Sequence, residues 1–316
     1  MKRLMVVIFV IILCLINIVC DSGEEIVTGK RNDNAIKLNI SLDGSLQNPA
    51  FSKDGRSIVF TRFRKGYNSP PSDLYIFNLE TEELKQLVAD GSSNVNLPGE
   101  CWNDSMRSIV FSSDRDPHDE IYMINADRSS GDEERITNRI SKMAFEPSFS
   151  PDGNWIVFES HQVDDEKNGV IIKYKTDGSS DFVNLTSEID DCRQPNWSPS
   201  GNLILFQKYE GGKWDIWTVD SEGINTNIIT NFTGNKTDGV FSGDGLFVVF
   251  SYENSDLESA NIYKVAISGG NPIRLTDFSG YDGAPSISRD GSRLVFESCN
   301  GDPEESSGTT IWMLKL

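Results

Sequence analysis

The two histidines of this chain, His118 and His161, are its first candidates for metal or acid–base chemistry. Carboxylates lie close to both, with Asp116 just before His118 and Asp164 just after His161. Two imidazoles and a carboxylate can bind a transition metal. Both histidines stand in polar segments, where solvated side chains are the commoner outcome. The pattern leaves a metal site and a plain solvated surface both open.

Other signatures of catalysis are missing from the printed sequence. It contains no Gly-x-Ser-x-Gly elbow, no Asp-x-Asp-x-Asp-Gly calcium loop and no Cys-x-x-Cys pair. We therefore expect a protein that is not an enzyme and that needs no cofactor.

The charge of the chain restricts its partners. It carries 29 basic and 48 acidic residues, a formal net charge of −19. Such a protein repels phosphate backbones, so we expect no nucleic-acid partner. Acidic residues gather in polar loops that favour a solvated surface or a surface for a basic partner. These loops are residues 112–119, 159–168, 251–260 and 297–309.

The first residues read as an export signal. Lys2 and Arg3 precede an apolar run over residues 4–19, which is short for a helix that crosses a membrane. Cys20 ends the run, and this resembles a bacterial lipoprotein signal, in which the cysteine is lipidated. An uncleaved anchor and a soluble exported form stay open. Each alternative places the body outside the cytoplasm, and the polar residues 21–34 read as a tether.

The body of the chain is one sequence repeat written six times. Each copy ends in a phenylalanine, and these phenylalanines lie 44 to 51 residues apart. Within a copy, an Asp-Gly pair such as Asp152-Gly153 separates two short apolar stretches, which indicates two strands joined by a tight turn. The closing phenylalanines are Phe60, Phe111, Phe158, Phe206, Phe250 and Phe296.

A third strand follows in each copy and a fourth in five of them, so the unit is a four-stranded sheet. Residues 73–79 and 84–88 are the third and fourth strands of the first copy. Six four-stranded units of about 47 residues predict an all-β fold, a six-bladed β-propeller over residues 35–316.

The last copy lacks its fourth strand because the chain ends at Leu316. Residues 35–41 alternate between polar and apolar types, as a half-buried strand does. We predict that this segment completes the last blade and closes the ring, and that Ile36, Leu38 and Ile40 are its buried side chains.

The repeats PSFSPDGNWIVF at 147–158 and PNWSPSGNLILF at 195–206 resemble the TolB-type propeller family of bacterial periplasmic proteins. The resemblance covers residues 35–316. It implies a channel whose mouth receives segments of partner proteins. Two departures are visible: Ser105-Met106 replaces Asp-Gly in the second copy, and nothing of the size of the family's N-terminal domain fits between Cys20 and Ala35. The Tol–Pal role is therefore not carried over as a whole.

The residues that enter the innermost strands are expected to surround the mouth of the channel. Carboxylates and amides there suit a basic peptide segment or a calcium ion held by oxygen ligands. The predicted mouth residues are Asn48, Glu100, Glu146, Gln194, Asp238 and Asp282.

Together these features predict a monomeric scaffold of the cell envelope, anchored to a membrane through Cys20, that binds an envelope protein or a basic peptide segment. The alternative is a metal-dependent or carbohydrate-active enzyme, a lyase or hydrolase, on the same propeller face. Oligogalacturonide lyases use related repeats with a histidine-rich metal centre, for which two histidines are too few. We expect Cys101, Cys192 and Cys299 to be free thiols, because alternate blades are too far apart for a disulfide.

Overall fold

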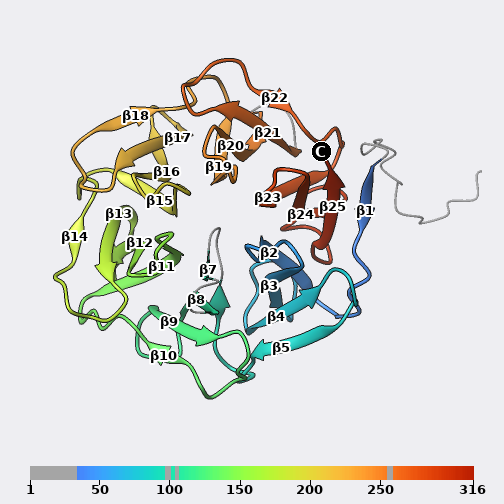
Figure 1. Cartoon of the computed structure of the whole chain (residues 1–316), viewed down its shortest axis with the longest axis horizontal. Helices are drawn as coiled ribbons and strands as arrows, with labels where there is room; N and C mark the ends of the chain where they lie inside the picture. Colours follow the sequence, from blue (N-terminus) through green and yellow to red (C-terminus); the bar gives the residue numbers. More distant parts are fainter. Residues whose placement is uncertain (1–33, 97–100, 104–106, 255–258) are drawn as a thin grey trace, which may run out of the picture.

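The computed structural model describes residues 34–96, 101–103, 107–254 and 259–316. Its sheets stand side by side in a closed ring around a central channel (Figure 1). No helix in these ranges is long and apolar enough to cross a membrane. The predicted all-β six-bladed propeller is confirmed.

Each blade is an antiparallel sheet. In the first five the strands follow chain order outward from the channel, and in the sixth the outermost strand comes from the N-terminal segment. The blade bounds, from first to last blade, are as follows. The first has β2 (Ser45–Phe51), β3 (Ser57–Phe63), β4 (Ser72–Asn78) and β5 (Leu84–Val88). The second has β6 (Val95–Asn96), β7 (Trp102–Asn103), β8 (Ser108–Ser113), β9 (Glu120–Asn125) and β10 (Glu134–Arg135). The third has β11 (Lys142–Phe149), β12 (Trp155–Gln162), β13 (Asp165–Lys175) and β14 (Val183–Asn184). The fourth has β15 (Asp191–Trp197), β16 (Leu203–Glu210), β17 (Lys213–Asp220) and β18 (Thr226–Ile228). The fifth has β19 (Asn235–Phe241), β20 (Phe247–Glu253), β21 (Ala260–Ala266) and β22 (Ile273–Arg274). The sixth has β23 (Tyr281–Ile287), β24 (Arg293–Cys299) and β25 (Thr310–Lys315), completed by β1 (Ala35–Lys37).

The turn between the two inner strands uses its aspartate locally, as predicted. In the last blade, Ser288 Oγ donates to the Asp290 carboxylate over 2.6 Å, and the Ser292 amide donates to it over 3.1 Å. These hydrogen bonds lower the pKa of Asp290 to about 2. Gly291 follows with a φ of 73°, which glycine adopts without steric cost. The repeated Asp-Gly pairs are therefore turn residues, and their carboxylates serve the fold.

The second blade differs from the others in its described residues. Two short strands, β6 and β7, both pair with β8 on its channel side. Arg107, at the start of the following strand, adopts a φ of 51°.

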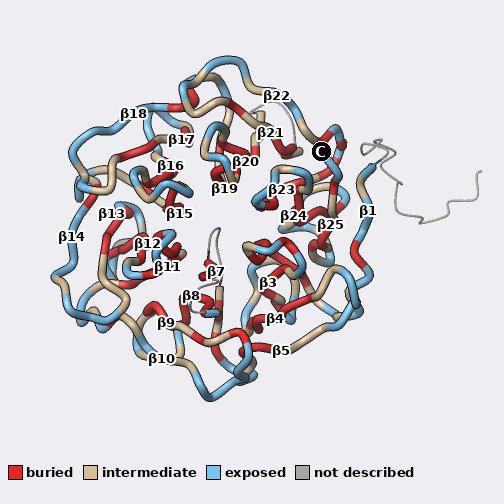
Figure 2. Tube along the Cα trace, viewed as in Figure 1, coloured by how far each residue is buried: buried red, intermediate tan, exposed pale blue. Residues whose placement is uncertain are grey.

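The core lies between neighbouring blades and runs along their strands (Figure 2). Five of the six closing phenylalanines have no exposed surface, and Phe206 is 2% exposed. Burying one such ring stabilises the fold by about 1.5–3 kcal/mol. The repeated phenylalanine therefore fills the interface between neighbouring blades with an aromatic side chain.

The sixth blade is closed by the N-terminal segment. Strand β1 pairs antiparallel with β25, and the Leu38 amide donates to the Ile311 carbonyl over 2.9 Å. The predicted closure is confirmed, although the strand is shorter than residues 35–41. The prediction for Ile36 was wrong: its side chain is 51% exposed, because β1 is the outer edge of the blade, whereas Leu38 is buried.

The three cysteines predicted to form no disulfide are buried. Cys101, Cys192 and Cys299 form no disulfide. Burial raises the pKa of Cys192 to about 12 and also raises that of Cys299. At neutral pH these two side chains are therefore uncharged thiols.

Candidate functional site

The channel mouth, the end of the channel at which the innermost strands begin, is built around a repeated bulge. In five blades the ladder between the first two strands skips at the same position, for example between Gln47 and Ala50. One residue of each bulge has a positive φ, which turns it out of the ladder. These residues are Asn48 (51°), Glu146 (53°), Gln194 (52°), Asp238 (54°) and Ala284 (45°).

A side chain from the preceding blade holds each of four bulges in place. The Asn48 amide donates to Glu297 Oε2 over 2.9 Å, and the Gln194 amide donates to Glu159 Oε2 over 2.8 Å. Both glutamates directly follow a closing phenylalanine. Gln207 and Ser251 hold the same place for Asp238 and Ala284, at 3.3 and 3.1 Å. The repeat therefore makes a ring of polar side chains that links the blades around the channel.

The channel mouth encloses a cavity of about 490 Å³. Four predicted residues line it: Asn48, Glu146, Gln194 and Asp238. The Gln194 Nε2 donates to Asp238 Oδ1, and the Asp238 amide donates back to Gln194 Oε1, both over 2.9 Å. Asn48 Nδ2 donates to Asn96 Oδ1 over 2.9 Å. The structure thus brings together the amides and two of the carboxylates that the sequence placed at the channel mouth.

Two tyrosines add hydroxyl groups to this cavity. Tyr67 and Tyr281 both donate to Glu297 Oε1, over 3.3 and 3.2 Å. Their rings meet edge to face with centroids 6.2 Å apart. Because Tyr67 belongs to the first blade and Tyr281 to the sixth, the contact joins two neighbouring blades at the channel mouth.

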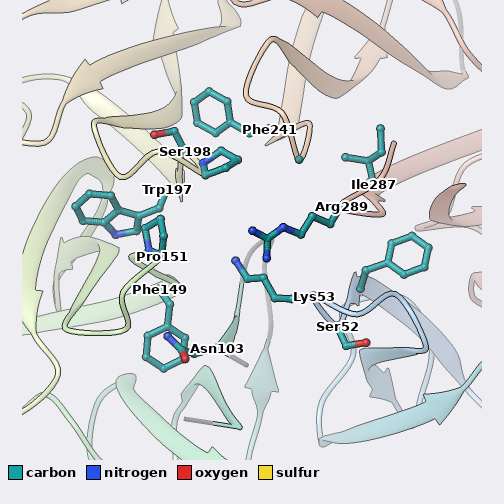
Figure 3. A pocket seen from close by; sticks show the side chains of 13 residues that line it. Ser52, Lys53, Asn103, Phe149, Pro151, Trp197, Ser198, Phe241, Ile287 and Arg289 are labelled. Atoms are coloured by element: carbon teal, nitrogen blue, oxygen red, sulfur yellow. The ribbon is translucent and has the colours of Figure 1, made fainter. Parts of the chain in front are cut away.

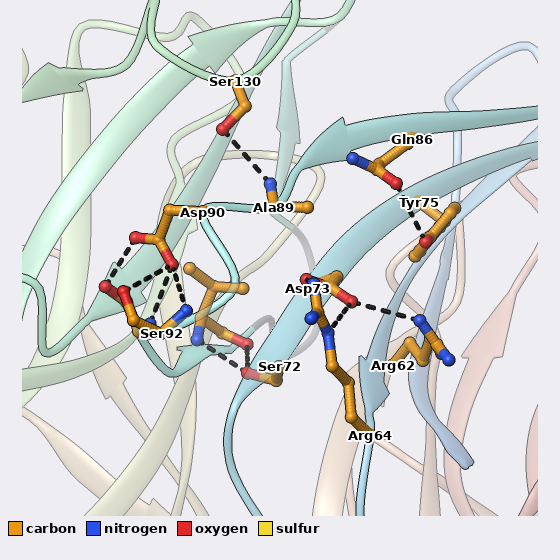
Figure 4. Close-up of polar contacts among 12 residues, drawn as sticks. Arg62, Arg64, Ser72, Asp73, Tyr75, Gln86, Ala89, Asp90, Ser92 and Ser130 are labelled. Atoms are coloured by element: carbon orange, nitrogen blue, oxygen red, sulfur yellow. Dashed lines mark hydrogen bonds and ion pairs between the residues drawn. The ribbon is translucent and has the colours of Figure 1, made fainter. Parts of the chain in front are cut away.

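The loop that carries Tyr67 is fixed at its base by a buried carboxylate. Asp73 has no exposed surface and accepts two hydrogen bonds from Arg64, over 2.7 and 2.8 Å (Figure 4). Arg62 adds a third contact at 3.4 Å. Next to Asp73, Ser72 Oγ accepts from the Val95 amide over 2.7 Å and ties the first blade to the second. The loop of residues 64–71 is therefore held in place at both of its ends.

Burial raises the affinity of two carboxyl groups at the channel mouth for protons. The pKa of Glu146 is well above its ordinary value, first because of burial and then because Glu159 and Asp238 repel its charge. Burial raises the pKa of Glu297 to about 7, and the charge of Asp238 adds to the effect against the opposing hydrogen bond from the Asn48 amide. Both carboxyl groups therefore bind a proton more tightly than an exposed glutamate does.

Two predicted mouth residues are not part of this cavity as described. Asp282 has no exposed surface and accepts a hydrogen bond from Ser298 Oγ over 2.6 Å within its own blade. Its placement was wrong, because the bulge of the sixth blade lies two residues later, at Ala284. Glu100 and the lipidation candidate Cys20 lie outside the described residues.

The histidines do not form the predicted pair of loop residues. His161 lies in β12, is 3% exposed and contacts Glu159 Oε1 through Nε2 at 3.1 Å. His118 lies in the loop between β8 and β9, where Asp116 pairs with Arg135 at 2.9 Å. Asp164 is exposed in the turn after β12. Within the described ranges no three His, Cys, Asp or Glu side chains are grouped so that they could hold a metal.

Sequence reasoning missed Glu297, Tyr281 and Tyr67. The first could have been found, because Glu159, Gln207 and Glu297 are polar residues at one fixed position of the repeat. Tyr67 lies in a loop that no other repeat copies, so the pattern carries no signal for it.

Comparison with known proteins agrees with this architecture. The family described as TolB beta propeller domain matches residues 24–238. A Tol-Pal system protein TolB from Francisella tularensis is 29% identical over 182 residues, 58% of this chain and 38% of that protein. The chain thus spans about two fifths of the length of the curated relatives it matches.

Two solved structures share the fold. A crystal structure of TolB from Acinetobacter baumannii has a TM-score of 0.63 at 19% identity, covering 84% of this chain and 65% of that one. An oligogalacturonate lyase from Vibrio parahaemolyticus has a TM-score of 0.54 at 12% identity, covering 86% of this chain and 90% of that one.

Proposed function

Because this chain belongs to the TolB beta propeller domain family, we propose that it is an exported scaffold of the cell envelope that binds a basic segment of another envelope protein at its channel mouth. The name of its Francisella relative refers to the Tol-Pal system, which supports an envelope location and a protein partner. The identity of the partner is left to experiment, since the match covers 38% of that relative.

The observation that carries the proposal is the set of carboxyl groups in the cavity. Glu146, Asp238 and Glu297 line one cavity of about 490 Å³, and no Lys or Arg is among its lining residues in the described structure. A Lys or Arg side chain that entered would meet charged and amide oxygens in a site shielded from water, where their attraction is stronger.

Proton release makes the affinity of this binding depend on pH. Burial raises the pKa of Glu146 and Glu297, and a cation favours their ionised forms, so its binding should release protons. Binding should therefore strengthen as pH rises through about 7. Calcium suits the same oxygen ligands, and we propose it as a competitor for the site.

The test is to replace Glu146→Gln, Asp238→Asn and Glu297→Gln together in the full chain and to recover its partners from envelopes by crosslinking at low salt. These changes keep the size of each side chain and remove three carboxylates. We expect the triple variant to lose most of the recovered partner, and the wild type to lose it as salt is added.

A matched control removes the same kinds of carboxylate elsewhere. Glu83, Asp181 and Glu134 are exposed, and Glu83→Gln, Asp181→Asn and Glu134→Gln should leave partner recovery unchanged. Equal recovery by wild type and the mouth variant would place the binding surface outside the channel mouth.

The alternative function, a metal-dependent lyase or hydrolase, rests on the fold shared with the oligogalacturonate lyase. It predicts a tightly bound metal ion in purified protein, together with turnover of an acidic oligosaccharide that a chelator abolishes. Metal analysis of the full chain separates this function from the binding scaffold that we propose.

A further inference from the structure

A second cavity, of about 240 Å³, lies at the far opening, the end of the channel at which the innermost strands finish. Its wall is made by the last residue of the innermost strand in five blades. These residues are Phe51, Phe149, Trp197, Phe241 and Ile287. This end of the channel therefore combines apolar residues with polar ones, which include Ser52, Asn103 and Ser198.

Two basic side chains reach into this apolar cavity. Lys53 and Arg289 come from the first and sixth blades, and their cationic ends point into the middle of the cavity toward each other (Figure 3). Trp197, Phe149 and Pro151 lie on the opposite side (Figure 3). The cavity thus has one cationic side and one aromatic side.

The carboxylates of Asp54 and Asp290 lie beside Lys53 and Arg289 in sequence. Each accepts hydrogen bonds from the serine and the backbone amide of its own turn. The side chain of Arg289 is exposed at the opening, where a ligand can reach it.

The backbone that carries Arg289 is held closely by the neighbouring blade. A Cβ atom added to Gly243 would lie 2.0 Å from the Arg289 carbonyl oxygen, so only glycine allows this approach. Arg289 thus projects from a fixed backbone position.

We infer that the far opening is a binding site for a small carboxylate with an apolar body, such as an arylalkanoic acid. The guanidinium of Arg289 presents paired N–H donors that match the two oxygens of a carboxylate. The aromatic side, with Trp197, takes the apolar body out of water. The volume of the cavity fits a molecule smaller than a typical drug. This site is separate from the channel mouth and does not depend on the function proposed for it.

The experiment titrates the full chain with 3-phenylpropionate at pH 7.5 and measures binding by calorimetry and by tryptophan fluorescence. The neutral 3-phenylpropionamide has nearly the same shape and serves as the matched ligand. We expect the acid to bind about tenfold more tightly than the amide, because a charged hydrogen bond is lost with the amide. The fluorescence response should disappear in Trp197→Phe.

Arg289→Gln should weaken binding of 3-phenylpropionate about tenfold and leave the amide unaffected. The control is Arg128→Gln, which removes an exposed arginine from the turn after β9 and should change neither affinity. Circular dichroism of each variant verifies its fold. The inference is overturned if the acid does not bind at millimolar concentration, if acid and amide bind equally, or if Arg289→Gln binds the acid as tightly as wild type does.

Discussion

Glu297 stands at the junction of the first and sixth blades and accepts hydrogen bonds from the Asn48 amide, Tyr67 and Tyr281. Its pKa is raised from 4.5 to about 7, so the folded state binds a proton that the unfolded state releases. The folded protein therefore loses stability as pH rises from about 4.5 to about 7, because it holds more protons than the unfolded chain across that window.

Glu297→Gln should abolish this part of the pH dependence. A neutral amide keeps an oxygen acceptor for the Asn48 amide and carries no charge to desolvate. Relative to wild type, the variant should gain up to about 3 kcal/mol in free energy of unfolding between pH 4.5 and pH 8. Urea denaturation at several pH values measures this, with the exposed Glu134→Gln as control. Parallel pH profiles for wild type and Glu297→Gln would contradict it.

Some residues of the channel mouth occupy a fixed position of the repeat and could be predicted from it, whereas others do not. Asn48, Glu146, Gln194 and Asp238 were predicted because each stands just before the repeated segment of its copy, and the structure places all four in one cavity. Asp282 was misplaced by two residues, because the same position of the sixth copy holds Ala284, which has no polar side chain to mark it.

At the scale of elements, loss of the segment that closes the sixth blade should lower the free energy of unfolding more than loss of any other strand. Leu38 is 9% exposed and packs into the core shared by the first and sixth blades. Leu38→Ala should lower the free energy of unfolding by about 2–3 kcal/mol through lost burial and the space left behind.

Ile36 gives the matched control because it lies on the same segment with half of its side chain exposed. Ile36→Ala should cost less than about 1 kcal/mol. Chemical denaturation of the two variants compares them directly. Similar losses for both would mean that the segment contributes through its backbone pairing and not through Leu38.

The strands were predictable because their causes are local and repeated. Residues 84–88 were predicted as a strand and form β5 with the same bounds. The outer strands of later blades are shorter than this one: β10, in the second blade, contains only Glu134–Arg135. An outer strand has a partner on one side only, and its length depends on neighbours that the sequence pattern does not specify.

At the scale of the whole molecule, the N-terminal segment is the proposed membrane anchor. We propose that Cys20 is lipidated and that residues 21–34 link it to the propeller. Cys20→Ser should leave an unprocessed precursor that incorporates no labelled fatty acid. Cys14→Ser changes the other cysteine of the apolar run and should be processed as wild type. Wild type that takes up no label would contradict the proposal.

The site of ring closure has a mechanical consequence. The strand that completes the sixth blade is also the strand that leads back toward the N-terminus, and it consists of Ala35–Lys37 paired with β25 near the end of the chain (Figure 1). Tension on the N-terminal segment would load these few hydrogen bonds before any other part of the ring. Peeling them away would expose the edge of β25 while the other blades stayed intact. A pull on the N-terminus would therefore open the propeller at one defined seam.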